Sequence, residues 1–273
     1  MSAPAPSRFT PAAKAMAENL VGITAVLAAC GKKPFGVSSG CFLTARSLEQ
    51  IKNDICYSDV PAALIGISSG VSYGALGTTH HSLHDLAVLR AINNITVVVP
   101  ADNFETREAI RAAALATRPF FVRFGKAAMY GLHSADTRLE VGKAITVREG
   151  TDIAMIATGE TVVHALLAAG ELESKGVTFR VLSMHTIKPL DTETILNTGR
   201  ECGAVMTVEE HFVNGGLGEA CASVLLQDGI SKPFRIVGIP DEETVTGAQA
   251  DIFRHYGISM EGLSHTALSF PLK

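Results

Sequence analysis

The chain has 273 residues, 47% of them hydrophobic and 18% charged, with a formal net charge of -4 at pH 7. This composition excludes a mainly disordered protein, and the mildly acidic balance without runs of Lys or Arg argues against nucleic acid as a partner. Because no apolar stretch approaches ~18 residues and the N-terminus lacks a signal pattern, we expect a cytoplasmic protein that does not enter a membrane.

Short β-branched runs alternate with helical patterns along the whole chain. The strand-like runs are 62–67, 95–99, 120–124, 153–157, 179–183, 204–208 and 234–237. The helical stretches are 13–30, 43–56, 83–92, 104–117, 162–175, 192–202 and 217–227. Each strand-like run is apolar on both sides of its pleat, which is typical of a parallel sheet covered by helices on both faces. The alternation predicts an α/β fold with parallel sheets.

A break in this pattern falls in the middle of the chain. Residues 132–138 are polar and show no periodicity, and a fresh strand–helix–strand pattern begins after 149–152. We therefore predict two α/β domains, at residues 1–135 and 140–273.

The helical stretch 13–30 carries one acidic residue, Glu18, among small and apolar neighbours. Such a helix is expected to be buried on most sides. Gly22, one turn later, leaves room for another group to approach the carboxyl. Burial would raise the pKa of Glu18 and keep it protonated, so that it could donate a hydrogen bond to a heterocyclic nitrogen. The helix alone leaves the alternative of a surface glutamate equally open.

Three histidines, His80, His81 and His84, lie within five residues in a segment that follows a strand and precedes a helix. This position places them at the carboxyl end of a parallel sheet, where α/β folds bind ligands. We expect proton transfer or contacts to a hydroxylated substrate. A metal site is the competing interpretation, although no companion ligand stands at convincing spacing. His84 and Asp85 fit better as residues of a helix N-terminus.

Several motifs together resemble one family. Met16-Ala-Glu-Asn-Leu-Val-Gly, Gly77-Thr-Thr-His-His-Ser and Phe121-Val-Arg are similar to the pyrimidine-binding domain of transketolases. Met184-His-Thr-Ile-Lys-Pro-Leu-Asp and Gly215-Gly-Leu-Gly are similar to the transketolase C-terminal domain. The motifs occur in order and span nearly the whole chain. The sequence most closely resembles the separate C-terminal subunit of split, two-gene transketolases.

This resemblance implies a thiamine diphosphate enzyme that transfers two-carbon ketol units between sugar phosphates. In the family, the glutamate matching Glu18 donates to N1′ of the aminopyrimidine, and the aromatic matching Phe42 stacks on that ring. The histidine matching His80 contacts substrate hydroxyls near the reacting carbon, with His81 beside it. The arginine matching Arg123 grips the sugar phosphate; a paired arginine at a strand end is the structural alternative for Arg123.

The resemblance also implies a partner. In this family the diphosphate and its Mg²⁺ are held by another domain with a Gly-Asp-Gly…Asn signature, which this sequence lacks. No metal ligands are therefore expected on this chain. We expect an obligate complex with an N-terminal transketolase subunit, as a heterotetramer with two copies of each chain.

Four departures from the family pattern affect the prediction. The family's pyrimidine domain begins with a strand and a helix before the segment matching Ser7-Arg-Phe, and both are missing from this sequence. Leu76 stands where the family has an aspartate that recognises sugar hydroxyls, and Ser68 where it has a substrate-binding histidine. Ser39 replaces the first aromatic of a Phe-x-x-Phe pair. Lost polar groups change sugar choice strongly, so we expect an unusual substrate such as apulose 4-phosphate or a sulfonated sugar.

Two other functions compete with a transketolase subunit. The β subunit of a 2-oxoacid dehydrogenase first component shares the two-domain plan and a matching glutamate. A non-catalytic assembly subunit would fit the missing leading strand. The Thr-His-His segment favours the transketolase. In the second half, His185 and His211 are expected to be structural, and Gly215-Gly-Leu-Gly to be a tight turn into a helix.

Overall fold

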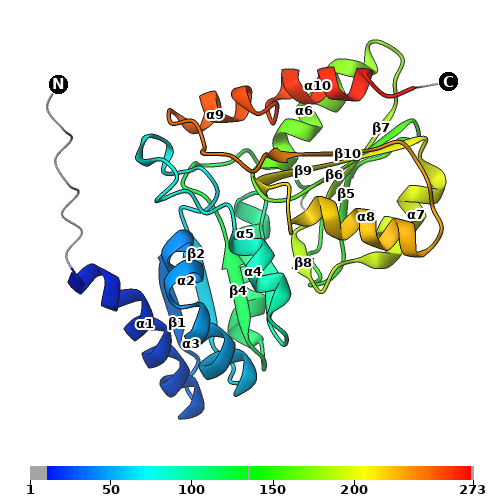
Figure 1. Cartoon of the computed structure of the whole chain (residues 1–273). Coiled ribbons are helices and arrows are strands. Elements are labelled where there is room, and N and C mark those ends of the chain that lie inside the picture. The colour runs from blue at the N-terminus through cyan, green and yellow to red at the C-terminus, as the bar shows by residue number, and fades with distance from the viewer. Residues whose placement is uncertain (1–10, 135, 272–273) are drawn as a thin grey trace, which may run out of the picture.

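The computed structural model describes residues 11–134 and 136–271, and side chains from residue 16 onward. The segment around Ser7, used in the comparison with the family's leading strand, lies outside the described residues. The first half (α1 to β4, blue to green in Figure 1) lies below and to the left of most of the second half (β5 to α10, green to red). The structure has two five-stranded sheets, one centred on each half of the chain.

The first sheet has the order β1-β2-β4-β3-β8. Its strands are β1 (Phe35–Ser39), β2 (Ala63–Ile67), β3 (Thr96–Val98), β4 (Phe120–Arg123) and β8 (Thr186–Lys188). The first four are parallel, whereas β8 comes from the second half of the chain and pairs antiparallel with β3. The helical segments around this sheet are α1 (Pro11–Ala29), α2 (Gly40–Arg46), α3 (Leu48–Gln50), the π-helical η1 (Ile51–Tyr57), the 3₁₀ turn η2 (Gly74–Leu76), α4 (Asp85–Ala91) and α5 (Asn103–Leu115).

The second sheet has the order β10-β9-β6-β7-β5, in which only the β5–β7 pair is antiparallel. Its strands are β5 (Ile145–Arg148), β6 (Ile153–Ala157), β7 (Phe179–Ser183), β9 (Ala204–Phe212) and β10 (Phe234–Ile239). The helices are α6 (Thr161–Glu173), α7 (Thr192–Glu201), α8 (Leu217–Gln227), α9 (Gln249–His255) and α10 (Met260–Leu268).

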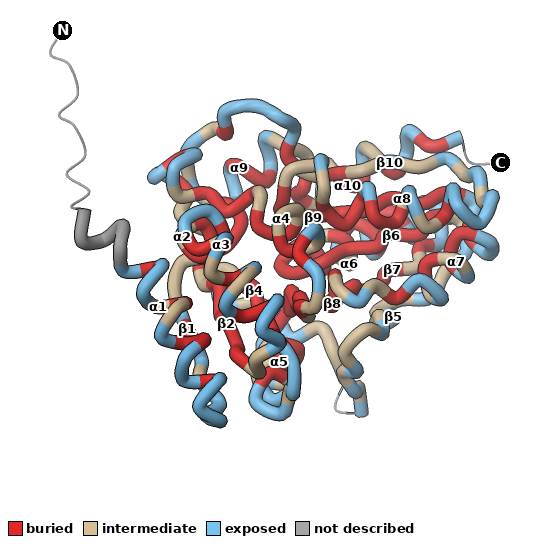
Figure 2. Tube along the Cα trace, turned by 60° about the horizontal axis from the view of Figure 1, so that its bottom comes forward, coloured by how far each residue is buried: buried red, intermediate tan, exposed pale blue. Residues whose placement is uncertain are grey.

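One hydrophobic core runs through both halves. It joins residues of α1, α2, η1 and α4 to one face of the first sheet, and continues through α7 and α8 to the second sheet. A separate cluster lies between α5 and the other face of the first sheet. Another covers the far face of the second sheet under α6, α9 and α10. Figure 2 shows β6 and β9 buried along their length, whereas α1 alternates between buried and exposed residues.

The predicted α/β class with parallel sheets is confirmed, and most predicted elements appear within two residues of their expected limits. Three strands, β1, β5 and β8, and two helices, α9 and α10, were not predicted. The expected helix 43–56 is broken into α2, α3 and η1. Among the described residues, no helix is both long and apolar enough to cross a membrane.

Candidate active site

Glu18 lies on the outer face of α1 and is exposed, so the surface position that the sequence left open describes it in the separate chain. The reason is the position of α1 at the outer edge of the first sheet, where it buries only one face. Val21 and Ala25 point into the core, and Thr24 packs so closely on β1 that a Cβ at Gly36 would lie 2.7 Å from its Oγ1. The opposite face, which carries Glu18, has no cover among the described residues.

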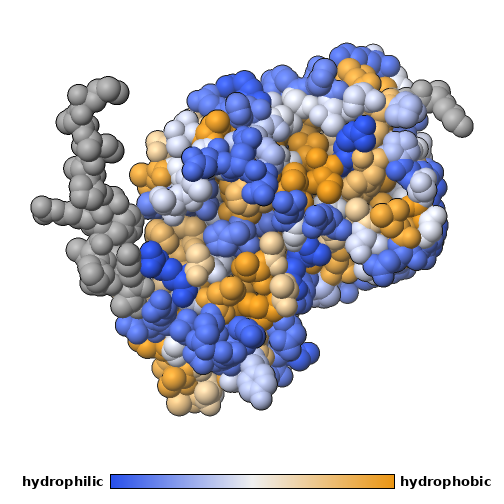
Figure 3. All heavy atoms as spheres, viewed as in Figure 1, coloured by the Kyte–Doolittle hydropathy of each residue, from blue (hydrophilic) through white to orange (hydrophobic). Residues whose placement is uncertain are grey.

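That outer face of α1 is apolar. Met16, Ile23 and Val26 are 69%, 60% and 62% exposed. Together with Glu18, Gly22 and Gln50 they border or line an open groove of about 540 Å³. Hydrophobic side chains also reach the surface elsewhere on the first half in the view of Figure 3. Exposed apolar surface around a carboxyl is typical of a face that another molecule covers.

A second group of side chains gathers where the parallel strands of the first sheet end. Phe42 follows β1, Tyr73 and His80 lie in the long segment after β2, and Lys126 follows β4. The rings of Phe42 and His80 are 5.4 Å apart and nearly perpendicular, and His80 meets Tyr73 in the same way at 5.4 Å. The Lys126 ammonium lies 3.7 Å from the centre of the Tyr73 ring. The structure thus brings the predicted pair Phe42 and His80 together.

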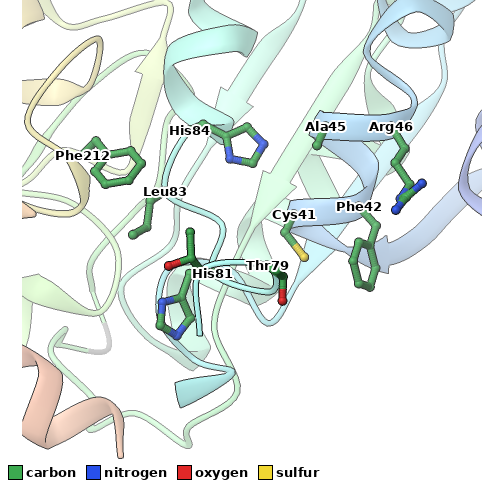
Figure 4. A pocket seen from close by; sticks show the side chains of 10 residues that line it. Cys41, Phe42, Ala45, Arg46, Thr79, His81, Leu83, His84 and Phe212 are labelled. Carbon is green, nitrogen blue, oxygen red and sulfur yellow. The ribbon is translucent and has the colours of Figure 1, made fainter. Parts of the chain in front are cut away.

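A cavity of about 280 Å³ adjoins this group between the two halves. Figure 4 shows Phe42 and Arg46 projecting from α2, with Thr79 and His81 opposite and Phe212 on the side of the second half. The ring of His84 points toward α2, where its Nε2 lies 3.3 Å from Thr44 Oγ1. This contact supports the structural role expected of His84.

His81 touches this cavity, but its polar atoms are already used. The side chain is buried, with Nδ1 2.7 Å from Thr244 Oγ1 and Nε2 2.9 Å from the carbonyl oxygen of Gly74. Burial lowers the pKa of His81, so the ring is held neutral. In the separate chain, His81 ties the loop after β2 to the second half, and its predicted contact with the substrate stays a prediction.

Arg123 is also turned inward. Its Nε donates to Oδ2 of Asp85 across 2.8 Å, and its Nη2 donates to the carbonyl oxygens of Ser82 and Glu210. Its side chain is only 4% exposed, so the guanidinium is not accessible to bind a sugar phosphate in this arrangement. The alternative of a paired arginine at a strand end describes Arg123, although the pair is buried and not on the surface.

Around Arg123 lies a buried acidic cluster. The amide of Gln249 donates to both Glu160 and Glu210, at 2.7 and 2.9 Å. Burial, together with the charge of Glu160, raises the pKa of Glu210 to about 8. His211, beside them, is held neutral because burial lowers its pKa to about 4. Its ring Nδ1 lies 2.7 Å from the Phe212 carbonyl oxygen, in line with the structural role expected from the sequence.

The groove on α1 fits one half of an aminopyrimidine cofactor. A Cβ at Gly22 would meet no atom within 4 Å, so open space stands beside the Glu18 carboxyl. The groove offers apolar walls, a carboxyl and amides, but no cation among its lining residues that could hold a diphosphate. Among the described residues, no His, Cys, Asp and Glu side chains gather as a metal site.

Sequence reasoning missed Tyr73 and Lys126. Lys126 had a usable signal, because it stands three residues beyond Arg123, past the carboxyl end of a parallel strand where ligands bind. Tyr73 had none in its own segment, since its contacts reach β1 and the loop after β4.

Comparisons with known proteins identify the family. The family patterns described as transketolase pyrimidine binding domain and transketolase C-terminal domain match residues 17–130 and 142–263. The chain is 46% identical over 257 residues to a subunit of the apulose-4-phosphate transketolase of Phocaeicola vulgatus, covering 94% of this chain and 82% of that protein. It is 35% identical over 223 residues to the 6-deoxy-6-sulfo-D-fructose transketolase subunit of a Clostridium species, covering 82% and 69%.

Among solved structures, a split-gene transketolase described as an inactive beta4 tetramer superposes with a TM-score of 0.83 at 33% identity, covering 93% of this chain and 81% of that one. Both domain patterns occur in this one chain in the family's order. The chain therefore belongs to the transketolase family, and it corresponds to the C-terminal subunit of split-gene transketolases.

Proposed function

We propose that this chain, joined to an N-terminal transketolase subunit, transfers two-carbon ketol units between sugar phosphates, with a branched sugar such as apulose 4-phosphate as a substrate. The observation that carries the proposal is the exposed Glu18 on an apolar helix face. A carboxyl with open space beside it, in a groove whose described lining residues include no cation to hold a diphosphate, is what one half of a cofactor site would offer. The other half, with Mg²⁺, is assigned to the partner.

Within that half-site, the chain's residues have distinct tasks. Glu18 is the carboxyl that would face a ring nitrogen of the cofactor once a second chain covers α1. Phe42 offers a half-exposed flat ring for stacking. When bound, thiamine diphosphate supplies the nucleophilic carbon that accepts the ketol unit. His80, held against Phe42, is placed to bind the hydroxyls of the sugar next to that carbon.

The anionic end of the sugar is assigned to Lys126, in place of the buried Arg123. Lys126 is exposed at the rim of the site, and its ammonium rests on the ring of Tyr73, which in turn contacts His80. A single ammonium can attract a phosphate or a sulfonate as a point charge. Lys126 therefore does not distinguish a phosphate from a sulfonate, and other residues of the pocket must do so.

Substrate choice follows from the neighbouring loop and from the relatives. Leu76 is 54% exposed in η2, where it presents an apolar side chain instead of a hydrogen-bonding group. The relative from Phocaeicola vulgatus is named for apulose 4-phosphate, and that from Clostridium for a sulfonated fructose. At 46% against 35% identity, the first is the stronger guide.

The test is to express the chain together with a transketolase N-terminal subunit from the same organism, purify the complex, and measure ketol transfer with added thiamine diphosphate and Mg²⁺. Apulose 4-phosphate, the sulfonated fructose and xylulose 5-phosphate are compared as donors. We expect turnover by the complex, none by this chain alone, and the highest kcat/KM for apulose 4-phosphate. Full activity of the isolated chain, or decarboxylation of a 2-oxoacid instead of ketol transfer, would contradict the proposal.

A further inference from the structure

Ser39 stands where the family has an aromatic residue. An aromatic ring from another segment nevertheless lies beside this position. The hydroxyl of Tyr73, from the loop after β2, lies 2.6 Å from Ser39 Oγ. Tyr73 is half-buried, and its ring lies among the side chains at the ends of β1, β2 and β4. An aromatic from a distant segment thus reaches the end of β1 at the point where the local aromatic is missing.

Three further contacts join Tyr73 to the site. Its ring meets His80 edge-on at 5.4 Å with an interplanar angle of 70°. Its face carries the Lys126 ammonium at 3.7 Å, within the range of a cation–π interaction. His80 in turn meets Phe42. One phenol ring therefore touches both groups assigned to the sugar, while its hydroxyl is tied to the end of β1.

The backbone next to Tyr73 is firmly placed. Gly74 has a φ of 51°, which favours glycine, and a Cβ there would lie 2.3 Å from the carbonyl oxygen of Gly247 in the second half. The Gly74 amide also donates to the carbonyl of Val71, and its carbonyl accepts from His81 if that ring carries its proton on Nε2. These contacts fix the backbone of the loop next to Tyr73. The hydrogen bond to Ser39 fixes the far end of the Tyr73 side chain.

We propose that Tyr73, anchored by Ser39, is a positioning residue that sets where His80 and Lys126 stand and thereby helps to select the sugar. This inference rests on the proposed function for the roles of His80 and Lys126. The Ser39–Tyr73 pair is assigned to the sugar because the Tyr73 ring contacts His80 and Lys126, the two groups proposed to bind the sugar. Its loss should therefore raise KM for the sugar phosphate while leaving thiamine diphosphate affinity unchanged.

A double-mutant cycle tests the anchor. Tyr73→Phe keeps the ring and removes the hydroxyl, and Ser39→Ala removes the partner. A hydrogen bond of ordinary net strength predicts that each variant raises the sugar KM about two- to tenfold. The double variant should be no worse than either single one, because both remove the same bond. KM values equal to wild type, or single effects that multiply in the double variant, would overturn the proposal.

The ring itself is tested with Tyr73→Leu, which removes the support of His80 and Lys126. We expect kcat to fall at least about tenfold as well, and Tyr73→Phe to restore most of it. The matched control is Tyr57→Phe, at a tyrosine that is 84% exposed and does not belong to this group of side chains. It should behave as wild type. Equal kcat in the Leu and Phe variants would show that the ring has no positioning role.

A readout without catalysis separates this inference from the proposed function. The readout is the ring-proton signals of His80 in the full-length chain with ¹³C-labelled histidine. Because the Tyr73 ring changes the magnetic environment of these protons, their signals should shift in Tyr73→Leu. They should stay in place in Tyr57→Phe. An unmoved His80 signal overturns the assignment of Tyr73 even if the complex is an active transketolase. A moved signal with no ketol transfer by the wild-type complex supports the positioning contact and contradicts the proposed function.

Discussion

Arg123 and Asp85 form a buried ion pair, 2.8 Å from Nε to Oδ2, that joins the end of β4 to the start of α4. The same guanidinium reaches the carbonyl oxygen of Glu210 in β9, so the pair also connects the two halves of the chain. Asp85 accepts a second hydrogen bond from Ser82 at 2.8 Å. The arginine that the sequence assigned to a sugar phosphate is thus part of the structural junction.

Breaking this pair should therefore lower stability. Asp85→Ala leaves the Arg123 charge buried without its carboxylate, which predicts a loss of about 3–5 kcal/mol in the free energy of unfolding, measured with urea. Arg118→Ala removes an arginine that is 66% exposed and paired with Asp59, and it should cost at most about 1 kcal/mol. Equal losses in the two variants would argue against a structural junction at Arg123.

The outer face of α1 should be an association surface. Ile23→Asp places a charge in that apolar face and should prevent assembly with the partner subunit, seen as a lower mass in light scattering coupled to gel filtration. The stability of the separated chain should change by no more than about 0.5 kcal/mol, because Ile23 is 60% exposed. Leu226→Asp, on α8 at 69% exposure, is the control that should assemble normally. Normal assembly of Ile23→Asp would remove α1 from the interface.

The charge of Lys126 should matter for the sugar and not for the fold. Lys126→Met keeps the length of the side chain and removes the charge, so we expect KM for the sugar phosphate to rise at least about tenfold, with a smaller change in kcat. Lys175→Met, at a lysine 51% exposed at the end of α6, should leave KM unchanged. A wild-type KM in Lys126→Met would assign the anionic end of the sugar elsewhere.

Stability should fall as the pH rises, because of Glu210. Burial first, and then the charge of Glu160, raise its pKa from 4.5 to about 8, while Arg123, the Val71 amide and the Gln249 side chain act in the opposite direction. A carboxyl whose pKa is higher in the folded state contributes fully below about pH 4.5, and this contribution is lost as the pH rises through about 8. The contribution of Glu210 to the free energy of unfolding should therefore decline between these values.

Glu210→Gln replaces this carboxyl by a neutral group of the same shape, and it should flatten that decline and stabilise the protein at pH 8. Chemical denaturation at several pH values gives the comparison. Glu243→Gln, at an exposed carboxyl, should keep the wild-type slope. Parallel pH curves for wild type and Glu210→Gln would show that Glu210 does not titrate in this range.

The regular elements of this fold were largely predictable from periodicity. β6 and β7 occupy the expected residues, and α8 begins directly after the predicted Gly215-Gly turn. β1 was missed because Phe35–Ser39 lies at a sheet edge and carries two serines and a glycine, so it lacks an apolar run. β8 was missed because three residues, Thr186–Lys188, are too few to show a pattern.

The site was predictable only where the family motifs define it. Phe42 and His80 lie together as the motifs indicated. The sequence left open whether Glu18 is buried, because an apolar sequence does not tell whether the same chain or another covers a helix. The ion pair of Arg123 and the anchor of Tyr73 depend on residues 38 and 34 positions away, which no local pattern connects.

The most direct test of the account is the carboxyl of Glu18 in the assembled complex. Glu18→Gln keeps the shape of the side chain but cannot cycle between a carboxylate and a protonated donor. We predict that the Glu18→Gln complex assembles and folds as wild type, while its ketol transfer falls at least about a hundredfold, a loss of about 2.7 kcal/mol in transition-state stabilisation. Wild-type turnover in an assembled Glu18→Gln complex would contradict the half-site on α1.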